Sequence, residues 1–320
     1  MDNISLINGK FIKENTHFKT LIAALKKSFS QTSVIVPQRH HHDFKNPAEK
    51  HDSTLLLMPA WNPSKEAGVK IVTVSPNNGK HKLPAIQGTY IYLDARLGQV
   101  KAILDAKELT VKRTAAASAL ASGYLSRKNA SKLLMIGTGA LSINLILAHA
   151  SVRPIKEVFV WGRSFEKALL ICEQLKEAPF ICTPVSSIKE TASNVDIISC
   201  ATLSETALVL GDFVKQGTHI DLVGAYKPTM READNDLIQK ASLYVDTLEA
   251  GCKESGDIAI PLKENIITKK DILGDLFSLC KSDIFKRKDN SEITVFKSVG
   301  HALEDLSAAT YYYNKYMGQQ

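Results

Sequence analysis

The spacing of apolar positions changes along the chain, and the change predicts two kinds of structure. Four short apolar runs near the N-terminus have the length and composition of strands. They cover residues 54–61, 68–74, 88–93 and 100–104. The last two runs flank a turn at residues 95–98 and predict a hairpin. Apolar positions at helical spacing predict one helix over residues 18–29 and a longer one over residues 106–125.

From residue 132 onward, apolar strands alternate with helical segments. Strands are predicted at residues 133–136, 158–161, 180–183, 195–200, 219–223 and 243–245. Such alternation is typical of a doubly wound parallel sheet with helices on both faces. From about residue 294 a strand, a turn and a helix are expected to return to the first part of the chain. We therefore predict an α/β protein with a Rossmann-type domain and a second, α+β domain.

A glycine turn follows the first of these alternating strands, in KLLMIGTGALS at residues 132–142. Gly137 permits a tight turn, and Gly139 lets a phosphate approach the backbone. The next helix then offers N–H groups and the positive end of its dipole. Ser142 replaces the third glycine of the usual pattern with another small residue. This order of strand, turn and helix predicts a binding site for the pyrophosphate of a dinucleotide.

The end of the second alternating strand bears on the choice of dinucleotide. In NAD-selective domains an acidic residue there bonds the ribose hydroxyls. Here the strand runs into Gly162, Arg163 and Ser164, with no acidic residue at its tip. Arg163 can pair with a 2′-phosphate, and Ser164 can donate a hydrogen bond while capping the next helix; a solvent-facing arginine beside an ordinary cap is the alternative. We predict a preference for NADP(H), with NAD(H) as the second choice.

Composition narrows the class of partner. The 320 residues can bury a large core and form two domains. The net charge is +7, but Lys and Arg are scattered, so we expect a small anionic ligand and not nucleic acid. No apolar run reaches the roughly 18 residues that a membrane helix needs, and the first residues lack the order of a signal peptide. Five widely spaced cysteines are typical of reduced thiols in a cytoplasmic protein.

Three cations stand out from this background. Arg39 follows the valine-rich segment 34–36, which reads as a strand, and can grip a carboxylate with two N–H groups. Lys70 lies in the middle of an apolar strand, where an ammonium is costly unless it meets an anion; an edge-strand lysine in water is the alternative. Arg113 opens a small-residue stretch of the long helix and is expected in a crowded place. The histidines at 40–42 alternate between strand faces, so no metal site is predicted.

Six segments spread along the chain form a recognisable combination. They are GVKIV with Lys70, LTVKRTAAASALA with Arg113, GTGA at 137–140, VGAYKPTMRE at 223–232, YVDTLEAGCKESGD at 244–257 and TVFKSVGHALEDL at 294–306. With these segments in this order, the chain resembles the ornithine cyclodeaminase and mu-crystallin family over essentially its whole length. The resemblance implies a homodimer. It also implies a substrate-binding and dimerisation domain at residues 1–112 and 294–320, and a Rossmann domain for NAD(H) or NADP(H) at residues 113–293.

The resemblance also implies roles for individual residues. Arg39, Lys70 and Arg113 correspond to the ligands of the substrate carboxylate, and Val299 matches a position near the nicotinamide and the substrate. Glu254 matches an acidic residue near the active site of ketimine-reducing members; an exposed loop carboxylate is the alternative reading. The implied cofactor-binding set is Arg113, Gly137, Gly139, Ala140, Leu141, Arg163, Ser164, Thr202, Val223 and Ser298.

One departure from the family pattern narrows the reaction. Ornithine cyclodeaminases carry an aspartate where this chain has Tyr226, and a phenol is a poor base at neutral pH. We therefore expect an NAD(P)H-dependent reductase of cyclic ketimine carboxylates, such as pyrroline-2-carboxylate or piperideine-2-carboxylate. Lys70, Glu254 and Tyr226 are the candidate catalytic residues. The alternatives are ornithine cyclodeamination, an amino-acid (alanine) dehydrogenase, or a mu-crystallin-like NADPH-binding protein without turnover.

Overall fold

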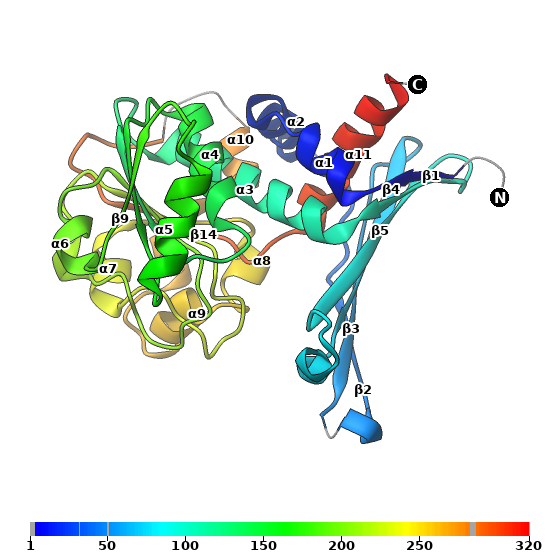
Figure 1. The fold of residues 1–320 in the computed structure, drawn as a ribbon, viewed down its shortest axis with the longest axis horizontal. Helices are drawn as coiled ribbons and strands as arrows, with labels where there is room; N and C mark the ends of the chain where they lie inside the picture. Colours follow the sequence, from blue (N-terminus) through cyan, green and yellow to red (C-terminus); the bar gives the residue numbers. More distant parts are fainter. Residues whose placement is uncertain (1–3, 32, 50, 282–285, 320) are drawn as a thin grey trace. The chain divides into compact units, whose positions relative to one another are not determined.

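The computed structural model describes residues 4–31, 33–49, 51–281 and 286–319, and it divides into two compact units (Figure 1). Unit 1 comprises residues 1–113 and 301–320, and unit 2 comprises residues 114–300. The division falls inside a single helix, α3 (Ala106–Leu125), which was predicted with these bounds. The chain therefore enters unit 2 through a continuous helix and leaves it shortly before residue 301.

Unit 1 contains a six-stranded sheet with the order β1-β6-β5-β4-β3-β2. Its strands are β1 (Ser5–Ile7), β2 (His40–Phe44), β3 (Ser53–Trp61), β4 (Glu66–Val74), β5 (Ile86–Asp94) and β6 (Val100–Asp105). Its helices are α1 (Gly9–Glu14), α2 (Phe18–Ser30) and α11 (Ala302–Met317), with short 3₁₀ turns η1 (Pro47–Glu49) and η2 (Pro76–His81). Neighbouring strands from β2 to β6 are antiparallel, so the four predicted strands and the predicted hairpin are confirmed.

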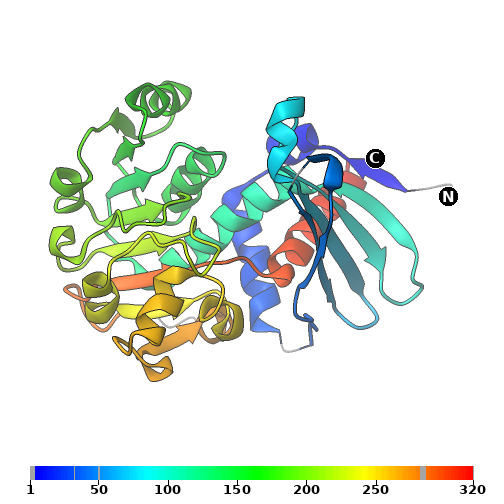
Figure 2. The ribbon, with the colours of Figure 1, turned by 90° about the horizontal axis from the view of Figure 1, so that it is seen from below.

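Helices α2 and α11 lie against one another, and α11 packs on strands β3, β4 and β5 (Figure 2). The side chains that meet this helix layer come from alternate strand positions, because successive strand residues point to opposite faces. One row crosses four strands and is buried throughout. It consists of Met58, Lys70, Tyr90 and Leu104. A lysine thus occupies a core position that the pattern would give to an apolar residue.

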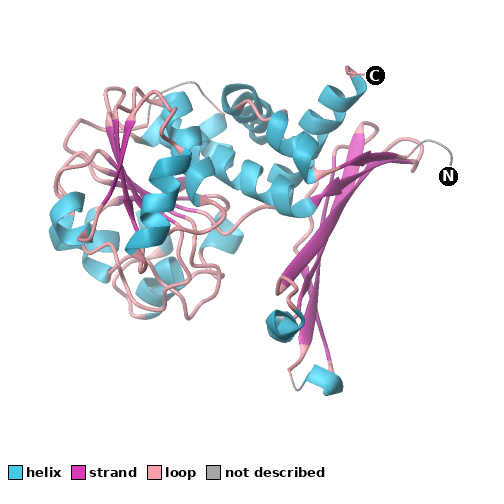
Figure 3. Ribbon diagram, viewed as in Figure 1, coloured by secondary structure: helices cyan, strands magenta, loops and turns pink. Residues whose placement is uncertain are grey.

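Unit 2 contains an eight-stranded, wholly parallel sheet with the order β13-β12-β14-β11-β10-β7-β8-β9. Figure 3 shows the strands of this unit in magenta, with helices in cyan around them. Its strands are β7 (Lys132–Ile136), β8 (Glu157–Trp161), β9 (Ile181–Pro184), β10 (Ile197–Cys200), β11 (His219–Leu222), β12 (Ser242–Val245), β13 (Ile272–Asp275) and β14 (Thr294–Lys297). Every residue of β10, β11 and β14 is buried, as expected for central parallel strands covered on both faces. The predicted Rossmann-type sheet is confirmed.

The helices of unit 2 connect these strands. They are α4 (Ser142–Val152), α5 (Phe165–Gln174), α6 (Ile188–Ala192), α7 (Asn235–Lys240), α8 (Leu248–Gly251), α9 (Gly256–Lys263) and α10 (Leu276–Cys280), with 3₁₀ turns η3 (Gly211–Phe213) and η4 (Lys269–Asp271). Strand β13 has no counterpart in the predicted set.

Two sequence-based expectations differ from the structure. The predicted domain boundary at residue 294 would detach β14, yet β14 pairs with β11 on one side and β12 on the other, so unit 2 continues to residue 300. The valine-rich segment before Arg39 forms only one isolated bridge, from Ile35 to Trp61. The strand instead follows Arg39 and contains the histidines, because β2 pairs with β3 at the sheet edge.

No helix in the described ranges is long and apolar enough to cross a bilayer. Within the same ranges, no group of three or more His, Cys, Asp and Glu side chains is arranged to hold a metal ion. All five cysteines are free thiols.

Candidate functional site

Two of the three predicted cations meet in the interior of unit 1. The Lys70 ammonium, from β4, lies 2.8 and 2.9 Å from the two carboxylate oxygens of Asp305 on α11. Arg113, from α3, donates its Nε–H to Asp305 Oδ1 at 2.9 Å. Its Nη1 lies 2.5 Å from Glu304 Oε2. Strand β4 and helices α3 and α11 thus bring two cations and two carboxylates into one cluster.

The cluster is buried and electrically balanced. Lys70 is 3% exposed, Arg113 is 5% exposed, and Glu304 and Asp305 are fully buried. Burial lowers the pKa of Lys70 to about 8, with Arg113 adding to the shift and Asp305 opposing it. Burial would raise the pKa of Asp305, but Arg113 and Lys70 outweigh it and hold that pKa below its ordinary value. The edge-strand alternative for Lys70 is therefore wrong, because Asp305 is the anion that offsets its burial.

Tyr90 forms one wall beside this cluster. It lies opposite Lys70 in the sheet, and its ring leans over Gly68, where an added Cβ would collide with the phenol oxygen. The hydroxyl is buried and has no hydrogen-bond partner among the described residues. Burial raises the pKa of Tyr90 well above its ordinary value, and the nearby Asp305 carboxylate adds to the shift. Tyr90 is therefore a neutral phenol, available to a ligand that reaches the cluster.

Arg39 lies apart from the paired cations. In the sheet, His40 pairs with Leu57, and Leu57 pairs with Ile71. Arg39 and Lys70, which directly precede His40 and Ile71, therefore lie at the same level of the sheet, two strands apart. At the usual strand spacing this separates their backbones by about 10 Å. Arg39 is half-buried at the sheet edge. Strand β3 lies between these two strands, with the buried Met58 directly opposite Lys70.

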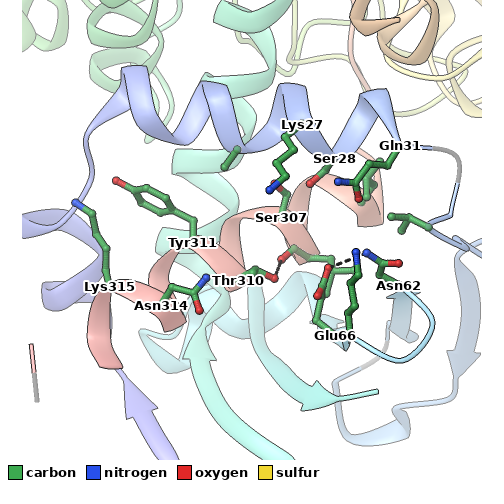
Figure 4. A pocket seen from close by; sticks show the side chains of 15 residues that line it. Lys27, Ser28, Gln31, Asn62, Glu66, Ser307, Thr310, Tyr311, Asn314 and Lys315 are labelled. Carbon is green, nitrogen blue, oxygen red and sulfur yellow. Dashed lines mark hydrogen bonds between the residues drawn. The ribbon is translucent and has the colours of Figure 1, made fainter. Parts of the chain in front are cut away.

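A cavity of about 500 Å³ opens elsewhere in unit 1, between α2, α11 and the β3–β4 turn (Figure 4). Its lining includes Lys27 of α2, Ser307 and Lys315 of α11, and Asn62 and Glu66 at the turn. The Asn62 amide donates to the Glu66 carboxylate at 3.3 Å. None of the predicted site residues lines this cavity.

In unit 2 a groove of about 610 Å³ lies along the glycine turn after β7. Gly137 has φ +115°, and a Cβ there would lie 2.5 Å from the Ala201 carbonyl oxygen, so only glycine fits. Above Gly139 an added Cβ would meet nothing, which leaves the backbone open to a ligand. Ser142 is buried and donates to the Gly137 carbonyl at 2.9 Å, as a close-packed small residue should. No side-chain hydrogen bond from Leu141 caps the first turn of α4, and the Ser142 N–H donates to the Gly139 carbonyl at 3.2 Å.

The end of β8 forms the far part of this groove. Arg163, Ser164 and Lys167 line it, and Ser164 caps α5 by accepting from the Lys167 N–H at 3.3 Å. The Ser164 hydroxyl donates to the exposed Glu166 carboxylate at 2.7 Å, and this bond lowers the pKa of Glu166. Sequence reasoning missed Lys167 and the approach of Glu166, because both lie on the helix beyond the strand tip.

The other predicted cofactor-binding residues lie in different parts of the structure. Thr202 lines the groove, but its hydroxyl donates to Glu232 Oε1 at 2.9 Å and so is already committed as a donor. Ala140 and Leu141 lie between the glycine turn and α4, and Val223 directly follows β11. Arg113 belongs to unit 1, with the carboxylate cluster.

The turn after β14 carries Ser298 and Val299. Asp246, fully buried after β12, accepts from the Val299 N–H at 2.7 Å and from the Gly300 N–H at 2.6 Å. Gly300 has φ +86°, which the sharp turn requires. Asp246 is thus the residue that fixes this turn, and nothing in its sequence context had pointed to it.

Glu254 and Tyr226, the remaining candidates, lie on loops of unit 2. Glu254 is half-buried between α8 and α9. Tyr226 is 41% exposed after β11, and the Lys227 ammonium lies 5.7 Å from its ring centroid.

Comparison with known proteins gives one family for the whole chain. The sequence profile of the Ornithine cyclodeaminase/mu-crystallin family matches residues 6–320. The Delta(1)-pyrroline-2-carboxylate reductase of Colwellia psychrerythraea is 37% identical over 310 residues, which span 96% of this chain and 97% of that protein. The Thermococcus litoralis Delta(1)-pyrroline-2-carboxylate reductase, solved with NADH and L-proline, superposes with a TM-score of 0.91 at 30% identity over 99% and 98% of the two chains. An archaeal alanine dehydrogenase dimer with bound NAD gives 0.89 at 25% identity over 99% and 97%.

Proposed function

The chain belongs to the ornithine cyclodeaminase/mu-crystallin family, and on this premise we propose that it is an NAD(P)H-dependent reductase of small cyclic ketimine carboxylates. The substrate class is that of pyrroline-2-carboxylate and piperideine-2-carboxylate. Hydride adds to the carbon of the protonated C=N bond, whose π electrons become the lone pair of the nitrogen, and a proton then added to that nitrogen gives the cyclic amino acid as its zwitterion. The two pyrroline-2-carboxylate reductases described above support this assignment at 37% and 30% identity over nearly the whole chain.

The observation that carries the proposal is the charge-balanced cluster of Lys70, Arg113, Glu304 and Asp305. A cyclic ketimine protonated on nitrogen carries one positive charge beside its carboxylate, so it is neutral overall. Arg113 and Lys70 suit the carboxylate, and an adjacent carboxylate suits the iminium N–H. A low-dielectric setting strengthens each of these contacts. A neutral zwitterion therefore enters without leaving an excess buried charge.

Lys70 is our candidate for the proton donor. Its pKa of about 8 places it near the value at which an ammonium both remains protonated at neutral pH and gives up its proton readily. Asp305 holds the ammonium by two contacts and so fixes its direction. In this assignment Arg113 orients the substrate carboxylate, and the family resemblance assigns Arg39 and Val299 to substrate binding as well. Glu254 and Tyr226 are the other candidates for proton transfer.

The groove of unit 2 fits a dinucleotide. It offers an open backbone at Gly139, the uncapped first turn of α4, and cationic side chains at the end of β8. When bound, the reduced nicotinamide supplies the hydride. Arg163 and Lys167 would pair with a 2′-phosphate, and Glu166 opposes them. We propose that the two cations outweigh the single carboxylate, so NADP(H) is preferred and NAD(H) is accepted second.

We further propose a homodimer formed through unit 1. The sheet face opposite Lys70 and Tyr90 carries half-buried apolar side chains at Leu57, Val69 and Ile71. A partially exposed apolar sheet surface favours association with a second copy.

Free thiols at all five cysteines are in keeping with a cytoplasmic protein.

Steady-state assays of the purified protein test the reaction. Pyrroline-2-carboxylate and piperideine-2-carboxylate are each supplied with NADPH or NADH, while L-ornithine and L-alanine are supplied with NAD⁺ or NADP⁺. We expect rapid oxidation of NADPH with a cyclic ketimine, and little ammonia from ornithine because Tyr226 replaces the family aspartate. Ornithine turnover above ketimine turnover would identify a cyclodeaminase, and alanine turnover a dehydrogenase. NADPH binding without any turnover would identify a mu-crystallin-like binding protein.

A further inference from the structure

We infer that Glu232 is a positioning residue for the nicotinamide cofactor, acting through the loops that follow β10 and β11. Its carboxylate is fully buried and accepts four hydrogen bonds. Oε1 accepts from the Thr202 N–H at 2.7 Å and from the Thr202 hydroxyl at 2.9 Å. Oε2 accepts from the N–H groups of Gly224 at 2.7 Å and Ala225 at 3.2 Å. The Glu232 carboxylate thus accepts hydrogen bonds from both the loop after β10 and the loop after β11.

These loops lie where an open parallel sheet binds its ligand, at the carboxyl ends of neighbouring central strands. Thr202 lines the dinucleotide groove, and its methyl group approaches Gly137. Gly224 lies so close to the Thr202 backbone that a Cβ would collide with it, so the two loops are in direct contact. Because the Thr202 hydroxyl also accepts from the Ser204 N–H at 3.4 Å, the wall from residue 202 to residue 204 is tied to Glu232.

Glu232 is itself held by a second buried acid. Asp257, at the start of α9, accepts from the N–H groups of Glu232 at 2.6 Å and Ala233 at 3.0 Å. The Lys297 ammonium, from β14, lies 3.0 Å from Asp257 and 3.8 Å from Glu232. All three side chains are fully buried. Burial of such a network is costly unless its charges are paired, and the hydrogen bonds into the loops together with the Lys297–Asp257 ion pair offset part of that cost.

These contacts give Glu232 an indirect role in cofactor binding. Glu232 lies beneath Thr202 and Gly224, and we assign it no contact with the cofactor. It fixes the groove wall before the cofactor arrives, which lowers the ordering cost of binding. Loss of its carboxylate should weaken cofactor binding, even in protein that is folded. This inference rests on the proposed function only in taking the groove to bind NADPH or NADH.

The test is fluorescence titration of NADPH and NADH into Glu232→Gln, with no ketimine present. The amide keeps the shape but places an NH₂ against N–H donors, so we expect the dissociation constant to rise about tenfold, the size of one lost hydrogen bond to a charged group. Glu173→Gln, which changes an exposed carboxylate paired with Lys176, is the matched control and should leave the dissociation constant unchanged. Circular dichroism and thermal unfolding without cofactor report the fold.

A purely structural role would lower the thermal midpoint of Glu232→Gln and leave its dissociation constants at the parent values, and that result overturns the inference. If Glu232→Gln does not fold, Thr202→Val decides: it removes one bond to Glu232, so its dissociation constant should rise about threefold. A parent-like value there overturns the inference, as does a parent protein that binds neither NADPH nor NADH. A parent that binds cofactor but reduces no ketimine refutes the proposed reaction and leaves this test intact.

Discussion

Lys70 and Asp305 are 235 positions apart in the chain, yet the ammonium of one lies within 2.9 Å of both carboxylate oxygens of the other. The pair joins the middle of β4 to the first turns of α11. Arg113 bonds the same carboxylate, so Asp305 serves two cations at once. The buried ammonium of Lys70 is therefore stabilised by a carboxylate that lies far away in the sequence.

The pH profile should follow the Lys70 ammonium. Its pKa of about 8 lies below the ordinary value of 10.5, mainly because of burial. If Lys70 donates the proton, kcat/KM for a cyclic ketimine should fall as pH rises through about 8. Lys70→Arg keeps the charge but cannot readily donate, so it should show a low rate without that limb. A parent profile that stays flat to pH 9.5, after correction for titration of the imine itself, would remove Lys70 from the donor role.

Asp305→Asn should destabilise the fold strongly. It leaves two buried cations with one carboxylate, and breaking a buried pair in this way costs about 3–5 kcal/mol. Urea denaturation followed by circular dichroism measures the free energy of unfolding. Glu14→Gln removes the carboxylate of an exposed pair with Lys10 and serves as the control, with no measurable change expected. Equal midpoints for the two variants would mean that the buried cluster does not stabilise the fold.

Gly68→Ala should also destabilise unit 1, for a steric reason. The new methyl group would collide with the phenol of Tyr90, which is fully buried and cannot swing into water. Overpacking of this kind costs about 1–3 kcal/mol. Gly79→Ala is the matched control, because a Cβ there meets nothing within 4 Å. Denaturant midpoints separate the two, and a Gly68→Ala protein as stable as Gly79→Ala would show that Tyr90 can move away.

The preference between NADPH and NADH should depend on both the cationic and the anionic side chain at the end of β8, Arg163 and Glu166. Arg163→Ala should raise the dissociation constant of NADPH about tenfold and leave that of NADH nearly unchanged, since only the 2′-phosphate pairs with the guanidinium. Glu166→Gln should lower the dissociation constant of NADPH and leave that of NADH nearly unchanged. The reason is that the Glu166 carboxylate, which accepts a hydrogen bond from Ser164, adds a negative charge near the expected position of the 2′-phosphate. Titration of both cofactors checks this. Equal parent affinities for NADPH and NADH would contradict the preference.

Local signals in the sequence were sufficient for most elements. Short apolar runs and the glycine turn predicted the strands and the Rossmann-type sheet, because strand length and turn chemistry are set by near neighbours. Arg113 and Lys70 were also found, since a charge among apolar or small residues is a local anomaly. Their partners were not, because Glu304 and Asp305 read as the ordinary acidic first turn of a helix.

The two cations are paired inside unit 1. Lys70 and Arg113 already have internal anions, so their burial alone does not require a substrate carboxylate. Removal of Arg113 is accordingly expected to affect the fold as well as substrate binding. The boundary near residue 294 was misplaced for a related reason: the position of β14 between β11 and β12 depends on pairings distant in sequence.

The route of the chain also has a consequence for biosynthesis. Strand β14 pairs with β11 and β12 in the sheet of unit 2, and α11 supplies the acids that neutralise Lys70 and Arg113 in unit 1. Both elements are synthesised after the strands and cations that they complete. Lys70 and Arg113 therefore lack their internal anions until α11 has been synthesised, although domains often fold in order of synthesis. A ribosome stalled before residue 294 would thus hold two incomplete cores exposed to chaperones and proteases.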